Sequence, residues 1–416
     1  MNEGAIFLIE PRDPLIARDG RPARLGEALA TLPFPPPGMI AGAARTRMAS
    51  IDGAFSCAAE DLDRLVEIPV HGPLLAELKE DGDGVACWFA PAPRDAVLFG
   101  DGFGDGVGGG VGDPEIPTLR RLAPRPVPHG ALAGGFRGEG TLPEGSLLPA
   151  FASPGPAGKP LAHPPVFWRW SNFAAWLGAE GQIEPAPLGL GRIEPEPRAH
   201  LAIEPGGRVG LEGRVFETLG LRFLAALPGA GPLAKLAVRR LALGLRTPGG
   251  TIGARPLELR KELAPLGGER RLARWRPATG ASWPALPPEI RKRIVETRRA
   301  RIVLLTPAEF EEGSRPGWNG GEIPGLAASA GGVTVTVQAA CVPRAEVVSG
   351  WDLRRGKAKP TRRLVPAGSV YWVELSGTGD LGAWCDALWL QPASDAESAR
   401  RNGYGLAALG VWEEES

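Results

Sequence analysis

Glycine and proline interrupt this chain so often that long helices have little room to form. Of its 416 residues, 59 are Gly and 44 are Pro. Gly weakens a helix through its backbone entropy, and Pro does so through its missing N–H group. They follow no collagen-like period and mark no internal repeat. The runs between them are short and apolar or alternating, which favours sheets joined by turns.

Several of these runs predict individual strands. GAIFLIEP, residues 4–11, has the composition of a buried first strand. LLAELKE and VACWFAP, within residues 74–91, flank the turn sequence DGDG and predict a hairpin. GGVTVTVQAACV, residues 331–342, shows the most regular apolar and polar alternation in the chain.

Helical spacing is confined to a few segments. A proline-rich entry predicts a helix at about Gly38–Ala49, and apolar spacing predicts another within residues 166–178. Residues 102–165 are rich in Gly and Pro without periodicity and predict a long insertion. Each half repeats strand, helix, strand, strand, so we expect an α+β fold whose helices cover one sheet face. The length suits two domains, which we place at residues 1–195 and 196–416.

Charge and cysteine content narrow the class of protein. Forty-seven basic residues balance forty-seven acidic ones, so any attraction for a polyanion must be local. The four cysteines form no CxxC pair, which argues against a zinc site or a disulfide framework. No signal-like amino terminus or membrane-length apolar run is present, so we expect a soluble, cytoplasmic protein with no membrane partner.

Motifs typical of catalytic or cofactor sites occur without the flanking strands, helices or ligands that such sites require. Gly104, Gly106 and Gly109 match GxGxxG, but neither a preceding strand nor a following helix is predicted. The acidic turn at residues 80–84 lacks the later ligands of a calcium loop. The four histidines are isolated in sequence, and no GxSxG motif occurs. We therefore predict no catalytic residue, no metal site and no cofactor.

Cationic residues form the strongest candidate site. Six of the ten residues from Arg354 to Arg363 are basic, and they follow Trp351, which could offer a stacking surface. Several cations at short spacing can neutralise successive RNA phosphates. A merely solvated loop is the alternative. The predicted contacts are Trp351, Arg354, Arg355, Lys357, Lys359, Arg362 and Arg363.

Two further segments have features that suit a phosphate backbone. Near the carboxyl end, Gly403 and Gly405 surround Tyr404, and glycines let another backbone approach closely. A simple turn is the alternative there. Near the amino end, the N–H groups around Gly38 could bind a phosphate at the start of the first helix. Four arginines accompany that helix: Arg18, Arg21, Arg45 and Arg47.

Five segments together resemble a known family. They are IEPRDPLIARDGRP, FPPPGMIAGAARTRM, TPAEFEEG, VSGWDLRRGKAKPTRRLVPAGSVYWVEL and NGYGLAALGVW, which run in order from Ile9 to Trp412. This set resembles the RAMP superfamily of CRISPR proteins. Within it, the chain is most similar to the third subunit of the Cmr complex, the type III-B antiviral effector.

The resemblance implies a fold and a role. It implies two tandem ferredoxin-like, RRM-like domains with long loop insertions. It also implies a non-catalytic subunit that grips the repeat-derived 5′ tag of the guide RNA (crRNA) and joins the large polymerase-like subunit to the backbone RAMP subunits. The insertion at residues 102–165 departs from the family pattern, so an RNA-contacting hairpin there stays unplaced.

The sequence is also compatible with two alternative functions. A RAMP-type endoribonuclease that processes guide RNA would need a histidine with a nearby Tyr or Lys. His200 would be its candidate, although Tyr371 and Tyr404 are the only tyrosines. A purely structural assembly subunit would contact proteins and little RNA.

Overall fold

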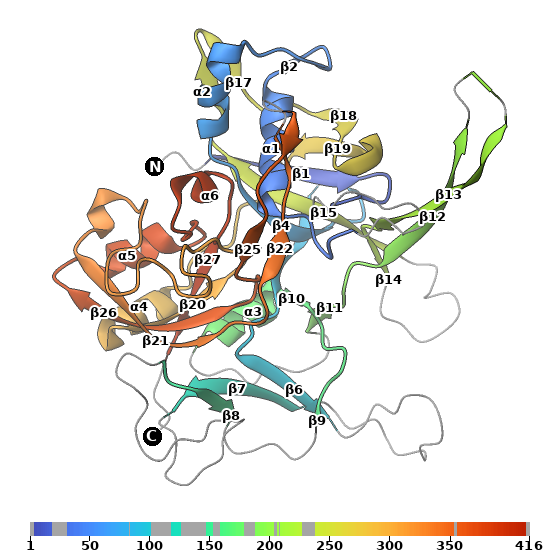
Figure 1. Ribbon diagram of the computed structural model, residues 1–416. Helices are drawn as coiled ribbons and strands as arrows, with labels where there is room; N and C mark the ends of the chain where they lie inside the picture. Colours follow the sequence, from blue (N-terminus) through green and yellow to red (C-terminus); the bar gives the residue numbers. More distant parts are fainter. Residues whose placement is uncertain are drawn as a thin grey trace, which may run out of the picture.

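The protein is built mainly from antiparallel sheets, with short helices packed on them (Figure 1). The computed structural model describes residues 4–18, 31–82, 84–100, 118–125, 147–152, 159–178, 188–203, 206–207, 209–226, 238–352 and 356–412. The combination of antiparallel sheets and short helices confirms the predicted α+β class. The α-helices are α1 (Pro37–Met48), α2 (Leu62–Glu67), α3 (Trp170–Leu177), α4 (Pro288–Thr297), α5 (Leu381–Leu388) and α6 (Glu397–Arg401).

The larger sheet is antiparallel throughout. Its path is β11 (Gly189–Leu190), β10 (Phe167–Arg169), β5 (Val85–Pro91), β4 (His71–Leu78), β15 (Val238–Thr247), β1 (Ala5–Pro11), β19 (Leu272–Pro277) and β18 (Glu262–Pro265), and β14 (Leu224–Ala226) also pairs with β15. Helix α1 begins at Pro37, and the missing N–H group of proline breaks no helical hydrogen bond at this position. The small residues of α1 let it pack closely on one sheet face. Ile40, Ala41 and Ala44 are buried there against Ile9 and Leu243.

The smaller sheet lies in the carboxyl-terminal part. Its antiparallel strands run in the order β21 (Val333–Cys341), β26 (Val370–Gly377), β20 (Arg299–Leu304) and β27 (Ala407–Val411). The alternation of β21 buries Val333, Val335 and Val337, as the sequence predicted. Helices α4 and α5 pack near β27, and one continuous core joins this sheet to the β4–β5 half of the larger one.

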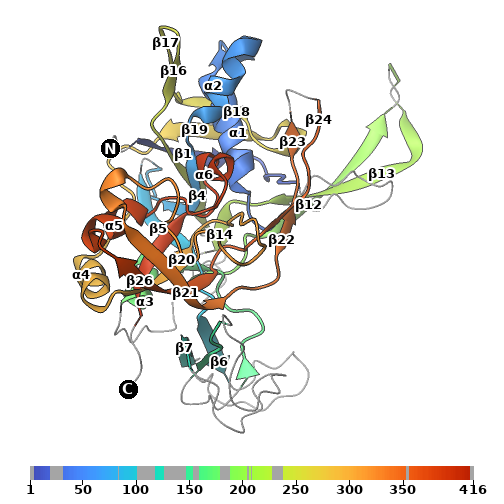
Figure 2. The ribbon, with the colours of Figure 1, turned by 60° about the vertical axis from the view of Figure 1, so that its left-hand side comes forward.

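Smaller β-structures extend from these two sheets (Figure 2). The longest is the hairpin of β12 (Pro195–Ile203) and β13 (Gly210–Leu221), which projects from the molecule in both ribbon views. A second sheet of four strands has the order β8 (Ala150–Ala152), β7 (Thr118–Pro124), β6 (Ala96–Gly100) and β9 (Lys159–Pro160). The remaining hairpins pair β2 (Ser50–Ile51) with β3 (Ala54–Phe55), β16 (Gly250–Ile252) with β17 (Arg255–Leu257), β22 (Glu346–Val348) with β25 (Arg362–Leu364), and β23 (Trp351–Asp352) with β24 (Lys357–Ala358).

Strand pairing adds detail to two sequence-based predictions. The boundary between residues 195 and 196 does not separate the sheets, because β15, β18 and β19 come after it and still join β1 in the larger sheet. The sequence period identified β15, β18 and β19 as strands but could not show which strands they pair with. In the chain, the β12–β13 hairpin separates them from the earlier strands of the same sheet. The predicted insertion at residues 102–165 contains strands β7, β8 and β9, while much of the rest, including the GxGxxG match, lies outside the described residues.

Within the described ranges, every helix is too short or too polar to cross a bilayer.

Candidate nucleic-acid interface

The predicted basic loop is the end of a two-stranded ribbon, which we call the basic ribbon (residues 346–364). Val348 pairs with Arg362 at its base, and Asp352 pairs with Lys357 nearer its tip. The ribbon leaves the carboxyl-terminal part and extends toward the side of the molecule that carries α1 (Figure 1, Figure 2). Antiparallel pairing therefore holds cationic side chains away from the sheet that anchors them.

Three cations of the basic ribbon are exposed. They are Lys357, Lys359 and Arg363, and none of them forms an ion pair within the described part of the chain. The Lys359 N–H donates to the Gly350 oxygen at 2.7 Å, and Ser349 Oγ donates to the Lys359 oxygen at 2.7 Å. The backbone is thus fixed while the charges stay available. Arg354 and Arg355 lie outside the described residues, as does the side chain of Trp351.

At the base of the ribbon, three sequence-distant segments meet at Tyr404. The Tyr404 hydroxyl is buried and accepts hydrogen bonds from Arg362 Nη2 at 3.0 Å and from the Gly38 N–H. The Arg362 guanidinium also lies 4.8 Å from the ring centroid and donates from Nη1 to Glu309 at 2.7 Å. Burial raises the pKa of Tyr404, so the phenol is neutral near pH 7. Arg362 is therefore half-buried and already paired, unlike the three exposed cations.

The glycines around Tyr404 pack against protein. Gly403 and Gly405 have φ of +80° and +82°, which suit glycine. A Cβ at Gly403 would lie 2.8 Å from the backbone oxygens of Val70 and Gly72, and one at Gly405 would lie 2.7 Å from Ser394 Oγ. This geometry argues against the expected close approach of RNA to this segment. The glycines are required by the fold itself.

Arg45 also serves the interior. It is 6% exposed, and its guanidinium donates to the Ile68 oxygen at 2.9 and 2.7 Å, to the Arg401 oxygen at 2.9 Å and to Asn402 Oδ1 at 2.5 Å. Burial, with Arg401 nearby, lowers the pKa of Arg45 to about 10, which leaves it charged at neutral pH. Its donors connect α1 to the α6 segment, so the predicted phosphate contact finds no support in this arrangement.

The other amino-terminal arginines lie apart from Tyr404. Arg47 is two residues beyond Arg45 and so about 200° around the helix, where its guanidinium lies 4.0 Å from Glu262. Arg18 is paired with Glu269. Arg21 lies outside the described residues. The predicted set is therefore split between exposed cations on the ribbon, the buried contacts at Tyr404 and separate surface pairs.

Comparison with known proteins identifies the family. The family model for the CRISPR-associated protein Cas_Cmr3 matches residues 7–412, nearly the whole chain. This chain belongs to the Cas_Cmr3 family. No curated protein sequence matches it significantly.

Two solved structures of type III-B Cmr-beta are similar to this Cas_Cmr3 chain. One is bound to cognate target RNA and AMPPnP, with 12% sequence identity, a TM-score of 0.43, and coverage of 88% of this chain and 86% of that chain. The other is bound to cognate target RNA, with 12% identity, a TM-score of 0.42 and the same coverage. Family membership itself rests on the sequence match.

The histidine considered for RNA cleavage lies on the projecting hairpin of this Cas_Cmr3 protein. His200 Nε2 is 2.9 Å from Thr218 Oγ1, and its ring stacks on Phe216 at a centroid distance of 5.1 Å. Neither tyrosine is near in the fold, since Tyr404 and Tyr371 are buried elsewhere. The arrangement is typical of a structural histidine.

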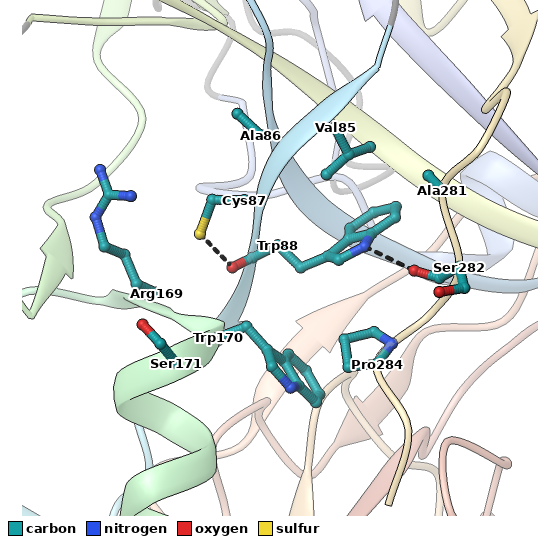
Figure 3. A pocket seen from close by; sticks show the side chains of 10 residues that line it. All are labelled: Val85, Ala86, Cys87, Trp88, Arg169, Trp170, Ser171, Ala281, Ser282 and Pro284. Carbon is teal, nitrogen blue, oxygen red and sulfur yellow. Dashed lines mark hydrogen bonds between the residues drawn. The ribbon is translucent and has the colours of Figure 1, made fainter.

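A pocket of about 500 Å³ lies beside β5 and the start of α3 in this Cas_Cmr3 fold (Figure 3). Cys87 lies on one side of the strand and Trp88 on the other. Trp88 Nε1 donates to the Ser282 oxygen at 3.0 Å, and Arg169 pairs with Glu77 at 3.4 Å. Burial raises the pKa of the Cys87 thiol, which disfavours the reactive thiolate. These groups satisfy one another and do not converge on a reacting atom.

Sequence reasoning missed the residues that hold the Tyr404 contacts together. Glu309 pairs with Arg362, and Asn402 accepts from Arg45. Thr306 Oγ1 donates to the Gly403 oxygen at 2.7 Å and accepts from the Leu406 N–H at 2.8 Å. Thr306 and Glu309 both fall in the segment TPAEFEEG, whose resemblance to the family was the available signal.

Proposed function

We propose that this chain is the non-catalytic guide-RNA-binding subunit of a type III-B Cmr effector complex. In this role it grips the 5′ repeat-derived tag of the crRNA and bridges the large polymerase-like subunit to the RAMP backbone. Membership of the Cas_Cmr3 family supports the placement in a Cmr complex. The observation that carries the RNA-binding role is the set of exposed cations on the basic ribbon, which form no ion pair with any described residue.

Charge distribution supports this assignment. The whole chain has no net charge, so it has no general attraction for RNA. Lys357, Lys359 and Arg363 are nevertheless concentrated on one projecting element and lack acidic partners among the described residues. Phosphate neutralisation requires cations in this state, because a paired cation must first lose its partner.

Strand order supports the implied tandem ferredoxin-like domains. That fold places its four strands in the order 4-1-3-2 within one antiparallel sheet. The path β27-β20-β26-β21 has this order, with α5 before its last strand. The path β19-β1-β15-β4 has it as well, with α1 after its first strand. We propose that each half contains one such unit, the first carrying a long insertion between β4 and β15.

A binding and cleavage assay tests the proposal. The purified chain and the reconstituted complex are each incubated with guide RNA that carries or lacks the 5′ tag, with a chelator present. We expect salt-sensitive binding that is stronger for the tagged guide, and no cleavage of guide by the free chain. Guide cleavage that is lost in His200→Ala would instead establish the endoribonuclease function. Equal, negligible binding to both guides would establish a purely structural role.

A further inference from the structure

One corner of the larger sheet carries several exposed side chains on the face opposite α1. Strand alternation places Ala273 and Trp275 of β19 in the core under α1, so Leu272, Arg274 and Arg276 point to the other face. The core shared with the carboxyl-terminal part covers this face over β4 and β5 and reaches Ala242 of β15 and Leu8 of β1, which pairs with Arg276. The corner formed by β14, β15, β1, β19 and β18 carries exposed aliphatic side chains: Leu224, Val238, Leu263 and Leu272.

Arginines dominate the polar part of this corner. In the sheet register, Arg274 of β19 lies opposite Glu10 of β1 and Leu263 of β18. Arg240 of β15 lies on the other side of β1 and donates to Glu10. Glu10 Oε1 accepts from both Arg12 and Arg240 at 3.3 Å. Arg274 is exposed and has no ion-pair partner in the described residues, and it lines a hollow of about 490 Å³ with Lys261, Glu262 and Leu263. We call this surface the arginine face: Glu10, Arg12, Leu224, Val238, Arg240, Leu263, Leu272, Arg274 and Arg276.

Arg276 is the most informative member of the arginine face. It is 6% exposed, yet its Nε and Nη2 are buried without a hydrogen-bond partner. Arg45 has the same exposure and makes four internal hydrogen bonds. A buried guanidinium without an acceptor is unfavourable in the free chain, since burial removes hydration that nothing replaces. Both atoms are buried, so a carboxylate or phosphate supplies the missing acceptor only when docking shifts this side chain toward the partner.

The apolar members of the arginine face decide between these anions. Single-stranded RNA on a sheet uses aromatic side chains as stacking platforms. The described residues of β1, β14, β15, β18 and β19 place no aromatic side chain on this face, because Phe7 and Trp275 lie in the α1 core. Exposed leucine and valine between arginines instead suit a protein surface with aliphatic and acidic side chains.

We propose that the arginine face is a docking surface for an acidic, aliphatic surface of another protein subunit. Carboxylates of that partner pair with Arg274 and Arg276, while its aliphatic side chains cover Leu263 and Leu272. This inference rests on the proposed function, because it assigns part of the bridging role to a surface separate from the basic ribbon.

A stability measurement tests the unpaired state of Arg276 in the free chain. Arg276→Met should raise the melting temperature by about 1–3 °C, because it removes an uncompensated buried charge. Arg45→Met is the matched control and should lower the melting temperature, because it breaks four hydrogen bonds at equal burial. A fall for Arg276→Met comparable to that of the control would overturn the proposal.

Reconstitution tests docking itself. The complex is assembled from guide RNA, the other Cmr subunits and either the parent chain, Arg274→Glu or Arg276→Met, and incorporation is measured by native mass spectrometry. Both variants should incorporate about tenfold less well, while their guide affinity as free chains stays within about twofold of the parent. Lys292→Glu on α4, an exposed site remote in sequence, should incorporate normally.

The outcomes separate this inference from the proposed function. Normal incorporation of Arg274→Glu would overturn the docking surface alone. A loss of guide affinity in the free variants would also overturn it, because the face would then bind RNA. Failure of the parent chain to bind guide, with the variants still excluded from assembly, would count against the proposed RNA role while supporting the docking surface.

Discussion

At the scale of single residues, position 405 requires glycine for two separate reasons. Its φ of +82° is unfavourable for other L-residues, and its Cβ position is occupied by Ser394. Gly405→Ala should therefore lower the free energy of unfolding by about 2–3 kcal/mol, measured by denaturant titration. Gly313→Ala isolates the backbone term, since Gly313 has φ of +73° and open space around it, and it should cost only about 1 kcal/mol. Equal losses in the two variants would contradict the predicted clash.

At the scale of elements, β4 and β15 place two basic groups side by side. His71 pairs with Arg246 in register, and burial together with that charge lowers the pKa of His71 to about 4. Between pH 6.5 and 4 the unfolded chain binds a proton that the folded chain does not, so stability falls as the pH falls. The contribution is fully present above pH 6.5, is lost below pH 4 and amounts to about 3 kcal/mol.

Unfolding free energies measured from pH 7 to pH 4 check this prediction. His71→Gln should show a shallower loss of stability across that range than the parent. His163→Gln is the control, because His163 is exposed and should follow the parent. Identical pH profiles for His71→Gln and the parent would contradict the assigned pKa.

The same scale shows what the sequence could and could not predict. Alternation over residues 331–342 and the turn within residues 74–91 were sufficient for β21 and for the β4–β5 hairpin, because period and turn chemistry are local. Which strands become neighbours is not local. The pairing of β1 with β15 joins strands more than 230 residues apart, which a boundary placed between residues 195 and 196 did not anticipate. The basic segment was recognisable, but the division between exposed Lys357 and half-buried Arg362 depends on Tyr404 and Glu309, which no spacing reveals.

At the scale of the whole molecule, a buried ion pair connects the smaller sheet to the segment between β5 and β6. Arg301 of β20 pairs with Asp95, which precedes β6, and both side chains are at most 1% exposed. Arg301 also donates to the Val411 oxygen at 2.7 Å and to the Trp176 oxygen at 2.6 Å, while Trp176 Nε1 donates to Asp95 at 2.8 Å. The smaller sheet, α3 and the segment between β5 and β6 therefore share one polar network, and we expect the two halves to unfold together.

Calorimetry of Asp95→Asn tests this coupling. The substitution leaves Arg301 buried without its counter-charge and should cost about 3–5 kcal/mol while preserving a single transition. Asp386→Asn breaks the exposed pair with Arg291 and should cost less than about 1 kcal/mol. Two separate transitions in the parent chain would show that the halves fold independently.

The most direct measurement of the central claim is the salt dependence of guide-RNA binding by the basic ribbon. Affinity for the 5′-tagged guide is measured across a salt series for the parent and for the Lys357→Ala, Lys359→Ala, Arg363→Ala triple variant. Arg291, Lys292 and Arg293 of α4, each changed to Ala, form the control triple, since all three are exposed and paired with acids. We predict weaker binding by the ribbon variant, with the slope of log K against log salt reduced by about two, and parent-like behaviour of the control. Parent-like affinity and slope in the ribbon variant would contradict the account.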